Sequence, residues 1–310
     1  MPSVFIDGEA GTTGLEIRQR LARLPLDVHS IAPDMRKDPA ARRALMAAVD
    51  VAILCLPEAA SREAVALADE LGRDAPRILD ASTAFRTDPS WAYGFPELNR
   101  SQQERVEFSM RVSNPGCYAQ GAIALLRPLV DGGLLPADFP VVINAVSGYS
   151  GAGRPAIEAH ERDGGPAFEL YALGLEHKHV PEIELYGGLT RRPLFVPSVG
   201  HFRQGMLVSI PLHLDELPSR PSGADLRAAL AARYADSRHV RVMPAEGAQR
   251  LEATALNNTD RMELSVFANE ALRHAVLVAR LDNLGKGAAG AAVQNLLLML
   301  GLAEEASPHG

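Results

Sequence analysis

The sequence has little cysteine, no long hydrophobic run and no repeated or low-complexity segment. Its 310 residues include only two cysteines, which lie in different surroundings and do not suggest a disulfide framework. No apolar stretch approaches the length that crosses a bilayer, and the first residues enter a strand at once. We therefore expect neither a membrane span nor a signal peptide, and we expect a cytoplasmic protein.

An excess of positive charge is also missing. Lysine and arginine number 31 against 38 aspartate and glutamate, so the formal net charge is −7, and the cations are scattered. General binders of nucleic acid or of anionic membranes carry clustered cations, so we expect neither partner. The composition, 47% hydrophobic and 22% charged, is that of a globular protein, and its length suits two domains.

One of the two cysteines lies in a turn motif. Asn114-Pro115-Gly116 precedes Cys117, and residues 119–130 have the apolar spacing of a helix. Cys117 is therefore expected on a sharp turn that leads into a helix N-terminus. There the unpaired N–H groups and the positive end of the helix dipole favour a thiolate, which is a nucleophile.

The alternative for any free cysteine is that of a small buried hydrophobe. Cys55 fits this alternative, because it lies within the continuous apolar run 51–56, which is typical of a buried parallel strand.

The first residues predict a nucleotide-binding loop. A strand over Ser3–Asp7 is followed by Gly8, Gly11 and Gly14, and then by a helix over 15–24. Glycines let the backbone approach a pyrophosphate, and the helix N-terminus offers N–H donors to it. The spacing Gly-x-x-Gly-x-x-Gly is not the commoner Gly-x-Gly-x-x-Gly, and a tight turn that binds nothing is the alternative.

The end of the second expected strand, over 27–32, bears on the choice of cofactor. NAD-specific folds usually place an acidic residue here for the ribose 2′-hydroxyl, whereas this strand ends with Ser30 and is followed by Arg36 and Lys37. We expect no group there that repels a 2′-phosphate, so the sequence favours NADP. Alternatively, the two cations are simply solvated.

The alternation of strands and helices continues. A strand over 51–56 closes at Pro57, a helix is expected over 59–71, and a strand over 77–80 leads into a loop that ends at Arg86. This order predicts a doubly wound parallel sheet with ligands at the carboxyl ends of its strands. Arg86 is a candidate clamp for a phosphate or carboxylate, or else a member of a surface ion pair.

Two motifs in the middle of the chain could contact a substrate. After a strand over 141–146, the glycine- and serine-rich loop 147–154 ends in Arg154 and could present backbone donors and a cation to an anion. Such loops also occur as plain connections.

His177, His179 and Glu182 follow close together, and Pro181 biases Val180 towards an extended backbone. If that geometry extends back, the two histidines point to the same side. Only two metal ligands are obvious, so we expect no metal and favour a histidine acid–base.

Taken together, these motifs make the sequence resemble the shorter type of N-acetyl-γ-glutamyl-phosphate reductase, in the aspartate-semialdehyde dehydrogenase-like group. The matching stretches run in family order along the chain: 8–14, 80–86, 113–117, 147–154, 177–183 and 282–295. Gln120 stands where many longer relatives have Thr, and Thr83 and Ala84 stand where an acidic residue commonly precedes the Phe.

The resemblance implies an α/β architecture of two domains. A Rossmann-type NADP-binding domain over residues 1–116 would be completed by a C-terminal helix over 284–310. Residues 117–283 would form an α+β catalytic and dimerisation domain of the glyceraldehyde-3-phosphate dehydrogenase-like type. A homodimer or homotetramer is expected.

The resemblance also implies the chemistry, which is NADPH-dependent reduction of N-acetyl-L-glutamyl 5-phosphate to the 5-semialdehyde in arginine biosynthesis. Cys117 would form a thioester, with His179 as acid–base and His177 as the near alternative. The implied substrate contacts are Arg86, Ser147, Gly148, Arg154 and Glu182. The implied cofactor contacts are Gly8, Gly11, Thr12, Thr13, Gly14, Ser30, Arg36, Leu56, Pro57, Asn283, Lys286 and Gly287.

Two other functions remain open. The same chemistry could act on aspartyl phosphate or on an N-protected aminoadipyl phosphate. A dinucleotide-sensing regulator without turnover is the alternative outside the enzymes.

Overall fold

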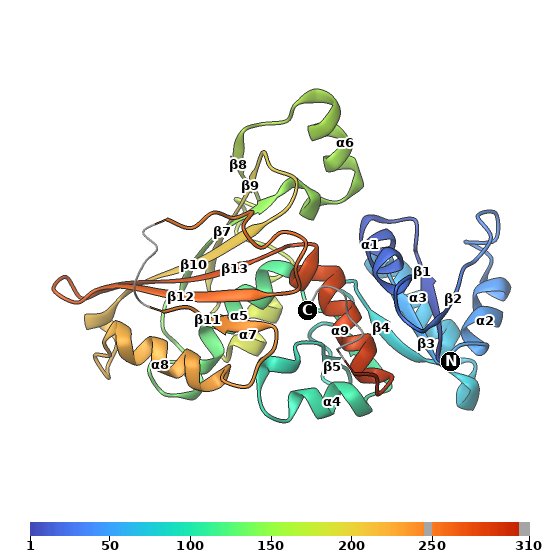
Figure 1. Ribbon diagram of the computed structural model, residues 1–310, viewed down its shortest axis with the longest axis horizontal. Helices are drawn as coiled ribbons and strands as arrows, with labels where there is room; N and C mark the ends of the chain where they lie inside the picture. The colour runs from blue at the N-terminus through green and yellow to red at the C-terminus, as the bar shows by residue number, and fades with distance from the viewer. Residues whose placement is uncertain (245–249, 304–310) are drawn as a thin grey trace. The chain divides into compact units, whose positions relative to one another are not determined.

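The computed structural model describes residues 1–244 and 250–303 and, at Pro155 and Asp163, the backbone alone. It divides into two compact units (Figure 1). The N-terminal unit comprises residues 1–96 and 100–115 and the chain from Ala288 onward, and the central unit comprises residues 97–99 and 116–287. The last residues of the expected C-terminal helix, 304–310, lie outside the described residues. No helix in the described part of the chain is long and apolar enough to span a membrane.

The N-terminal unit is built on a six-stranded sheet in the order β2-β1-β3-β4-β6-β5, in which every pairing is parallel. This is the predicted doubly wound arrangement. Its strands are β1 Ser3–Asp7, β2 Asp27–His29, β3 Val51–Leu54, β4 Arg77–Asp80, β5 Ala92–Tyr93 and β6 Arg111–Ser113. Its helices are α1 Thr12–Leu21, α2 Pro39–Ala47, α3 Glu58–Asp69, α4 Gln102–Phe108 and α9 Gly290–Met299.

Helices cover both faces of this sheet because its central strands are apolar on both sides. Val4 and Ile6 lie in a buried cluster with α1, α4 and α9, whereas Phe5 lies in a second cluster with α2 and α3. The side chains of adjacent β1 residues thus point to opposite faces of the sheet, as the two-residue period of a strand requires. The segment from Ala288 onward therefore completes the first core.

The first helix and the second strand differ from the sequence prediction. The helix begins at Thr12 rather than Leu15, because Gly11, with an extended backbone, already serves as its N-cap. The second strand ends at His29 instead of Ala32, so Ser30 lies in the connection that follows it.

The third strand ends at Leu54, and Cys55 follows it rather than lying within it. Cys55 keeps some exposed surface, which corrects the expectation of a fully buried side chain. Burial in the first place, and the nearby carboxylates of Asp80 and Asp7 in addition, nevertheless raise the pKa of the thiol to about 12.

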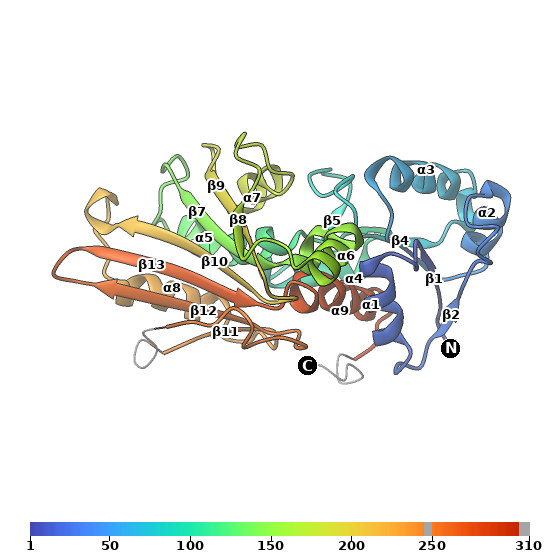
Figure 2. The same cartoon turned by 90° about the horizontal axis from the view of Figure 1, so that it is seen from above.

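The central unit carries a seven-stranded mixed sheet in the order β11-β12-β13-β10-β7-β9-β8. Its strands are β7 Val142–Gly148, β8 Phe168–Leu170, β9 Leu194–Gly200, β10 Met206–His213, β11 Val240–Val242, β12 Met262–Asn269 and β13 His274–Leu281. Its helices are α5 Cys117–Asp131, α6 Arg154–Asp163, α7 Val180–Gly187 and α8 Gly223–Arg233. The long strands β10, β12 and β13 lie side by side in Figure 2.

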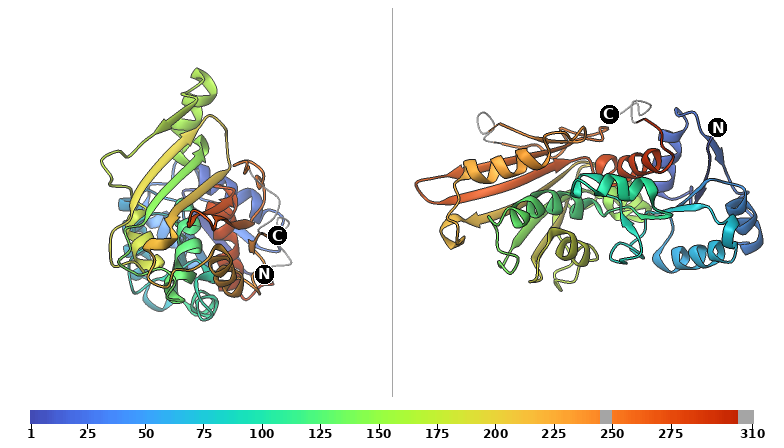
Figure 3. Two further views of the ribbon diagram at one scale, coloured as in Figure 1. Left: turned by 90° about the vertical axis from the view of Figure 1, so that its left-hand side faces the viewer. Right: turned by 90° about the horizontal axis from the view of Figure 1, so that it is seen from below.

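Helices α5 and α8 pack on one face of this sheet, and α7 packs on α5 (Figure 3). Residues along the strands alternate between that face and the other one. On β10, for example, Val208 and Ile210 are buried, whereas Leu207 and Ser209 are only partly buried. The second face is hollowed over a volume of about 520 Å³.

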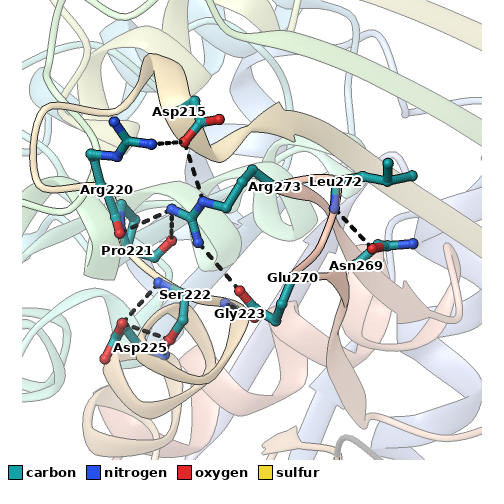
Figure 4. Close-up of polar contacts among 10 residues, drawn as sticks. All are labelled: Asp215, Arg220, Pro221, Ser222, Gly223, Asp225, Asn269, Glu270, Leu272 and Arg273. Atoms are coloured by element: carbon teal, nitrogen blue, oxygen red, sulfur yellow. Dashed lines mark hydrogen bonds and ion pairs between the residues drawn. The ribbon is translucent and has the colours of Figure 1, made fainter.

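The turn between β12 and β13 is fastened to the start of α8 (Figure 4). Arg273, which has a left-handed backbone with φ 53°, pairs with Asp215 and Glu270, each at 3.3 Å. Glu270 also accepts the N–H of Gly223, the first residue of α8, at 2.7 Å. Ser222 completes the helix start through a capping box. These contacts hold the hairpin end against the helix that covers the sheet.

Candidate active site

Cys117 is the first residue of α5, and Gly116 is the N-cap with an extended backbone. The turn motif therefore leads into a helix as predicted, although the helix begins at Cys117 and not at residue 119. The first hydrogen bond of the helix joins the Gln120 N–H to the Gly116 carbonyl at 3.0 Å. The N–H groups of Cys117, Tyr118 and Ala119 thus have no carbonyl within the helix, and they and the helix dipole favour a thiolate. The cysteine is partly exposed, as a nucleophile must be.

Helix α7 is attached to the turn before the cysteine. The Gly116 N–H donates to the carboxylate of Glu182 at 3.1 Å, and that side chain is only 1% exposed. Glu182 therefore holds the backbone from which Cys117 projects.

Both histidines lie just before α7. His179 is its N-cap, with φ −86° and ψ −14°, and Val180 is its first residue. The expectation that Pro181 would hold Val180 extended was wrong, because a proline in the first turn needs no N–H partner and is pre-organised for a helix. The two rings therefore do not lie on one side of a strand but meet edge to face, with centroids 4.7 Å apart.

The ring of His177 has both nitrogens engaged. Its Nδ1 accepts the backbone N–H of His179 at 3.2 Å, and its Nε2 lies 3.3 Å from the hydroxyl of Tyr171. An Nδ1 that accepts an N–H carries no proton, so the neutral ring holds its proton on Nε2. His177 is thus fixed in one tautomer and orients the chain at His179.

Two tyrosines complete this cluster, and the sequence analysis missed both. The ring centroid of Tyr118 lies 5.8 Å from that of each histidine, and its hydroxyl donates to the Ser198 carbonyl at 2.9 Å. Burial raises the pKa of Tyr118, with the neighbouring Tyr171 and Cys117 as further causes. Burial likewise raises the pKa of Tyr171 to about 12, and the charge of Cys117 contributes. Both hydroxyls therefore stay protonated and neutral near the cysteine.

A π-helical turn over Gly285–Ala289 approaches Cys117 from another side. A Cβ on Gly287 would lie 3.0 Å from the Cβ of Cys117 and from the Asp282 carbonyl oxygen, so a larger residue would crowd the cysteine. The side chain of Gln120, one helical turn after the cysteine, donates to the Lys286 carbonyl at 2.8 Å. Gln120 therefore fixes this turn against the start of α5.

Lys286 was predicted as a cofactor contact, but the structure buries its side chain. The ammonium pairs with Glu97 at 2.8 Å, and the two side chains are 1% and 8% exposed. Its charge is thus held by a carboxylate inside the central unit, and its role towards a nucleotide stays a prediction.

The glycine- and serine-rich segment divides into two parts. Ser147 and Gly148 belong to β7, and the Gly148 N–H donates to the Gly205 carbonyl at 2.9 Å. Asn283, predicted beside the cofactor, accepts the Gly205 N–H at 2.8 Å and donates to Ser150 at 2.9 Å. Asn283 therefore joins the segment after β7 to the residue before β10.

Arg154, in contrast, starts α6 with its side chain 71% exposed and paired with Glu158 at 2.7 Å. Exposed pairs of this kind contribute little stability, so the guanidinium can change partners at small cost. Its role as an anion contact stays a prediction.

Arg86, in the N-terminal unit, is buried. Its Nε donates to the Asn114 carbonyl at 3.0 Å, and one terminal nitrogen reaches the Ala81 carbonyl at 3.4 Å. Arg86 therefore joins the chain after β4 to the Asn-Pro-Gly motif.

The loop after β1 fits a dinucleotide. Gly8 has a left-handed backbone with φ 87°, and a Cβ there would lie 2.3 Å from the Cys55 carbonyl oxygen. A Cβ on Gly14 would lie 2.5 Å from the Gly8 oxygen, so the loop closes tightly onto the start of α1. No side chain caps this helix, whose first residues are Thr12 and Thr13. A bare helix N-terminus behind a glycine cradle is the arrangement that binds a pyrophosphate.

The predicted contacts Leu56 and Pro57 follow β3 beside this loop. The Leu56 side chain lies 3.1 Å from the position of a Cβ on Gly8, and Pro57 is the N-cap of α3. Both therefore adjoin the carboxyl end of the sheet.

We expected no acidic group at the end of the second strand, and the structure corrects this. Ser30 donates its hydroxyl to the carboxylate of Glu9 at 3.0 Å, so an acidic group does lie at the end of this strand. This carboxylate comes from the glycine loop, so the residues of the second strand alone did not predict it. Arg36 and Lys37 are exposed in the next turn, and neither has a partner among the described residues.

Comparisons with known proteins agree with these features. A family model described as semialdehyde dehydrogenase, NAD binding domain, matches residues 27–106, and one described as semialdehyde dehydrogenase, dimerisation domain, matches residues 117–283. Aspartate semialdehyde dehydrogenase from Francisella tularensis has the same fold, with a TM-score of 0.74 at 11% identity over 97% of this chain and 100% of its own.

Two full-length relatives are much more similar. N-acetyl-gamma-glutamyl-phosphate reductase of Chelativorans sp. is 52% identical over 96% of this chain and 97% of its own. N-acetyl-gamma-glutamyl-phosphate reductase 2 of Pseudomonas putida is 52% identical over 97% of each chain. The resemblance predicted from the motifs is confirmed, and the chain belongs to the N-acetyl-gamma-glutamyl-phosphate reductase family.

Proposed function

We propose that this chain reduces N-acetyl-L-glutamyl 5-phosphate to N-acetyl-L-glutamate 5-semialdehyde and phosphate with NADPH, through a thioester on Cys117. The main support is the partly exposed cysteine at the N-terminus of α5, next to Tyr118, whose ring lies 5.8 Å from that of each of two buried histidines. A thiolate there is a nucleophile with an acid–base group nearby, which is what acyl transfer requires. Arginine biosynthesis is the pathway of this reaction, and a reducing cytoplasm suits the free cysteines.

The two parts of the chain have separate tasks in this proposal. Residues 1–116, with the C-terminal helix, hold NADPH through Gly8, Gly11 and Gly14 and the first residues of α1. Residues 117–283 carry the nucleophile and the substrate contacts. When bound, NADPH supplies the hydride that reduces the thioester carbon.

The protein's own groups carry the remaining steps. The Cys117 thiolate attacks the acyl carbon, a C–S bond forms, and the C–O bond to the phosphate breaks, so that phosphate leaves with the bonding electrons. After reduction, the oxygen of the thiohemiacetal carries the charge, and His179 donates a proton to it. His179 then takes the proton back, the carbonyl re-forms, and the C–S bond breaks to return the thiolate.

We assign the acid–base role to His179 because His177 is committed elsewhere. Protonation of His177 on Nδ1 would cost the bond from the His179 N–H, and its Nε2 already faces the hydroxyl of Tyr171. Glu182 acts through its bond to the Gly116 N–H and positions the cysteine. Arg86, Arg154, Ser147 and Gly148 remain the proposed substrate contacts.

We propose that two copies of the chain associate through the open face of the central sheet. Apolar side chains line the hollow there, among them the partly buried Leu207 and Phe267 and the exposed Phe168. Apolar residues on an open sheet face are a surface that a second protein can cover. The matched description of this region as a dimerisation domain supports the proposal. A homodimer fits one such face, and a tetramer would need a second.

The substrate test uses the reverse reaction. With NADP and inorganic phosphate at alkaline pH, we expect N-acetylglutamate 5-semialdehyde to generate NADPH absorbance, with no signal when phosphate is omitted. Aspartate semialdehyde and an N-protected aminoadipate semialdehyde serve as comparisons, and a higher kcat/KM for either would reassign the substrate. NADPH binding without any phosphate-dependent turnover would favour the regulator.

The cofactor test compares NADPH with NADH. The exposed Arg36 and Lys37 after β2 offer charge to a 2′-phosphate, and such contacts contribute about 1.5–3 kcal/mol, or about tenfold to a hundredfold. We expect a higher kcat/KM for NADPH, and we expect Arg36→Ala to narrow the difference chiefly through the KM for NADPH. Arg73→Ala, which removes an exposed cation elsewhere in the same unit, is the control. Equal kcat/KM for both cofactors in the unmutated enzyme would contradict this account.

A further inference from the structure

We propose that Glu9 is a specificity-determining residue that limits the preference of this enzyme for NADPH over NADH. The inference rests on the proposed function, since it concerns the cofactor of that reaction. Its origin is the hydrogen bond at 3.0 Å between the carboxylate of Glu9, from the glycine loop, and Ser30, just after β2. The end of the second strand is where this class of fold receives the adenosine ribose.

The backbone of the loop holds Glu9 in this place. Gly8 has the left-handed φ of 87°, and Gly14 packs so closely that a Cβ would lie 2.7 Å from the Cα of Glu9. The loop therefore has little freedom to carry the side chain away. The side chain is itself only 16% exposed, and besides Ser30 it faces Arg18 of α1, at 3.8 Å.

The chemistry of a carboxylate distinguishes the two cofactors. An ionised carboxylate only accepts hydrogen bonds, so it can accept one from a ribose 2′-hydroxyl, which NADH has. NADPH carries a 2′-phosphate instead, which is anionic and is repelled by a carboxylate at short range. The usual device of NAD-specific folds is an acidic residue at the strand end itself. Here an acidic side chain reaches the same strand end from the glycine loop.

Cations nearby act in the opposite sense. Arg36 and Lys37 are exposed in the turn that follows Ser30 and have no partner among the described residues, so both are available to a phosphate. Glu9 and these cations therefore oppose one another, and the net preference for NADPH is smaller than the cations alone would give.

The test is Glu9→Gln, which keeps the size of the side chain and removes its charge. Dissociation constants of NADPH and NADH are measured on the free protein by nucleotide fluorescence, so the readout does not depend on turnover. We expect the ratio of the NADH to the NADPH constant to rise by about tenfold, through tighter NADPH and weaker NADH, as the loss of one charged contact predicts. Glu63→Gln, on an exposed position of α3, removes the same charge away from the loop and should leave the ratio unchanged.

The outcomes separate the possibilities. A ratio in Glu9→Gln that stays within about twofold of the Glu63→Gln ratio, or one that falls, would overturn the inference. Thermal unfolding of each variant shows whether the loop has stayed folded, and Glu9→Asp, which retains the charge, should keep the unmutated preference if charge is the cause. Failure of the unmutated protein to bind either nucleotide would instead count against the proposed function.

Discussion

Cys117→Ser is expected to reduce turnover to below about 1% of the unmutated enzyme while leaving NADPH affinity and thermal stability largely unchanged. The N–H groups at the start of α5 stabilise a thiolate at this position, but a serine hydroxyl does not ionise near neutral pH. The substitution keeps nearly the same size, so the contact with Gly287 is preserved. Steady-state kinetics, a nucleotide titration and a melting curve on the same preparation make the measurement.

Cys55→Ser is the matched control, because it makes the same chemical change at the other cysteine. It should retain most of the activity. If Cys117→Ser kept more than a few per cent of the unmutated kcat, the covalent mechanism would be wrong. A parallel loss of NADPH binding would point to a folding defect instead.

Alkylation gives an independent readout of the same thiolate. Iodoacetamide reacts with the thiolate and not with the thiol. Because the pKa of Cys55 is raised to about 12, its thiol is almost entirely protonated at pH 8 and should react slowly there despite some exposure. Peptide mapping should therefore find the label on Cys117 first.

The sheet of the N-terminal unit could be predicted because its signals are local. Apolar runs bounded by glycine and proline give β1 and β4 with the bounds that the structure has. The ends of β2 and α1 could not be predicted as well, because they depend on where Gly11 caps the helix and where pairing with β1 stops. The pairing of β2 depends on β1, which is distant in sequence, whereas the cap at Gly11 is a local feature that the glycine spacing did not reveal.

The position of Cys117 was predictable for the same reason. Pro115 and Gly116 specify a turn, and the apolar spacing after them specifies a helix, so the cysteine at their junction follows from adjacent residues.

The surroundings of the cysteine were not predictable, because they come from separate elements. No sequence motif marks Tyr171 or predicts that Gln120 contacts Lys286. The partner of Lys286, Glu97, lies far away in sequence. Glu9 is similar, since only the fold brings it to Ser30. One interpretation failed for a local reason, as Pro181 could equally open a helix or extend the chain before it.

His179→Asn is expected to lower kcat by about 10²-fold or more, whereas His177→Asn should cost less. An amide cannot donate and recover a proton at the thiohemiacetal oxygen, so the step assigned to His179 would lose its acid–base group. The fold should tolerate the change, because asparagine is a favoured N-cap and His179 is the N-cap of α7. Measurement of kcat, KM and the melting temperature for both variants separates chemistry from binding and folding.

His177→Asn is the matched comparison, since it makes the same replacement two residues away. Its amide oxygen can still accept the His179 N–H, but the contact of Nε2 with Tyr171 is lost. Tyr171→Phe removes that contact from the other side, so it should resemble His177→Asn in kcat if His177 only positions its neighbour. Should His177→Asn prove the more damaging of the two histidine variants, with both folded, the two roles would have to be exchanged. During each turnover His177 would then have to break either the hydrogen bond that its Nδ1 accepts from the His179 N–H or the contact of its Nε2 with Tyr171, because one of these nitrogens must transfer the proton.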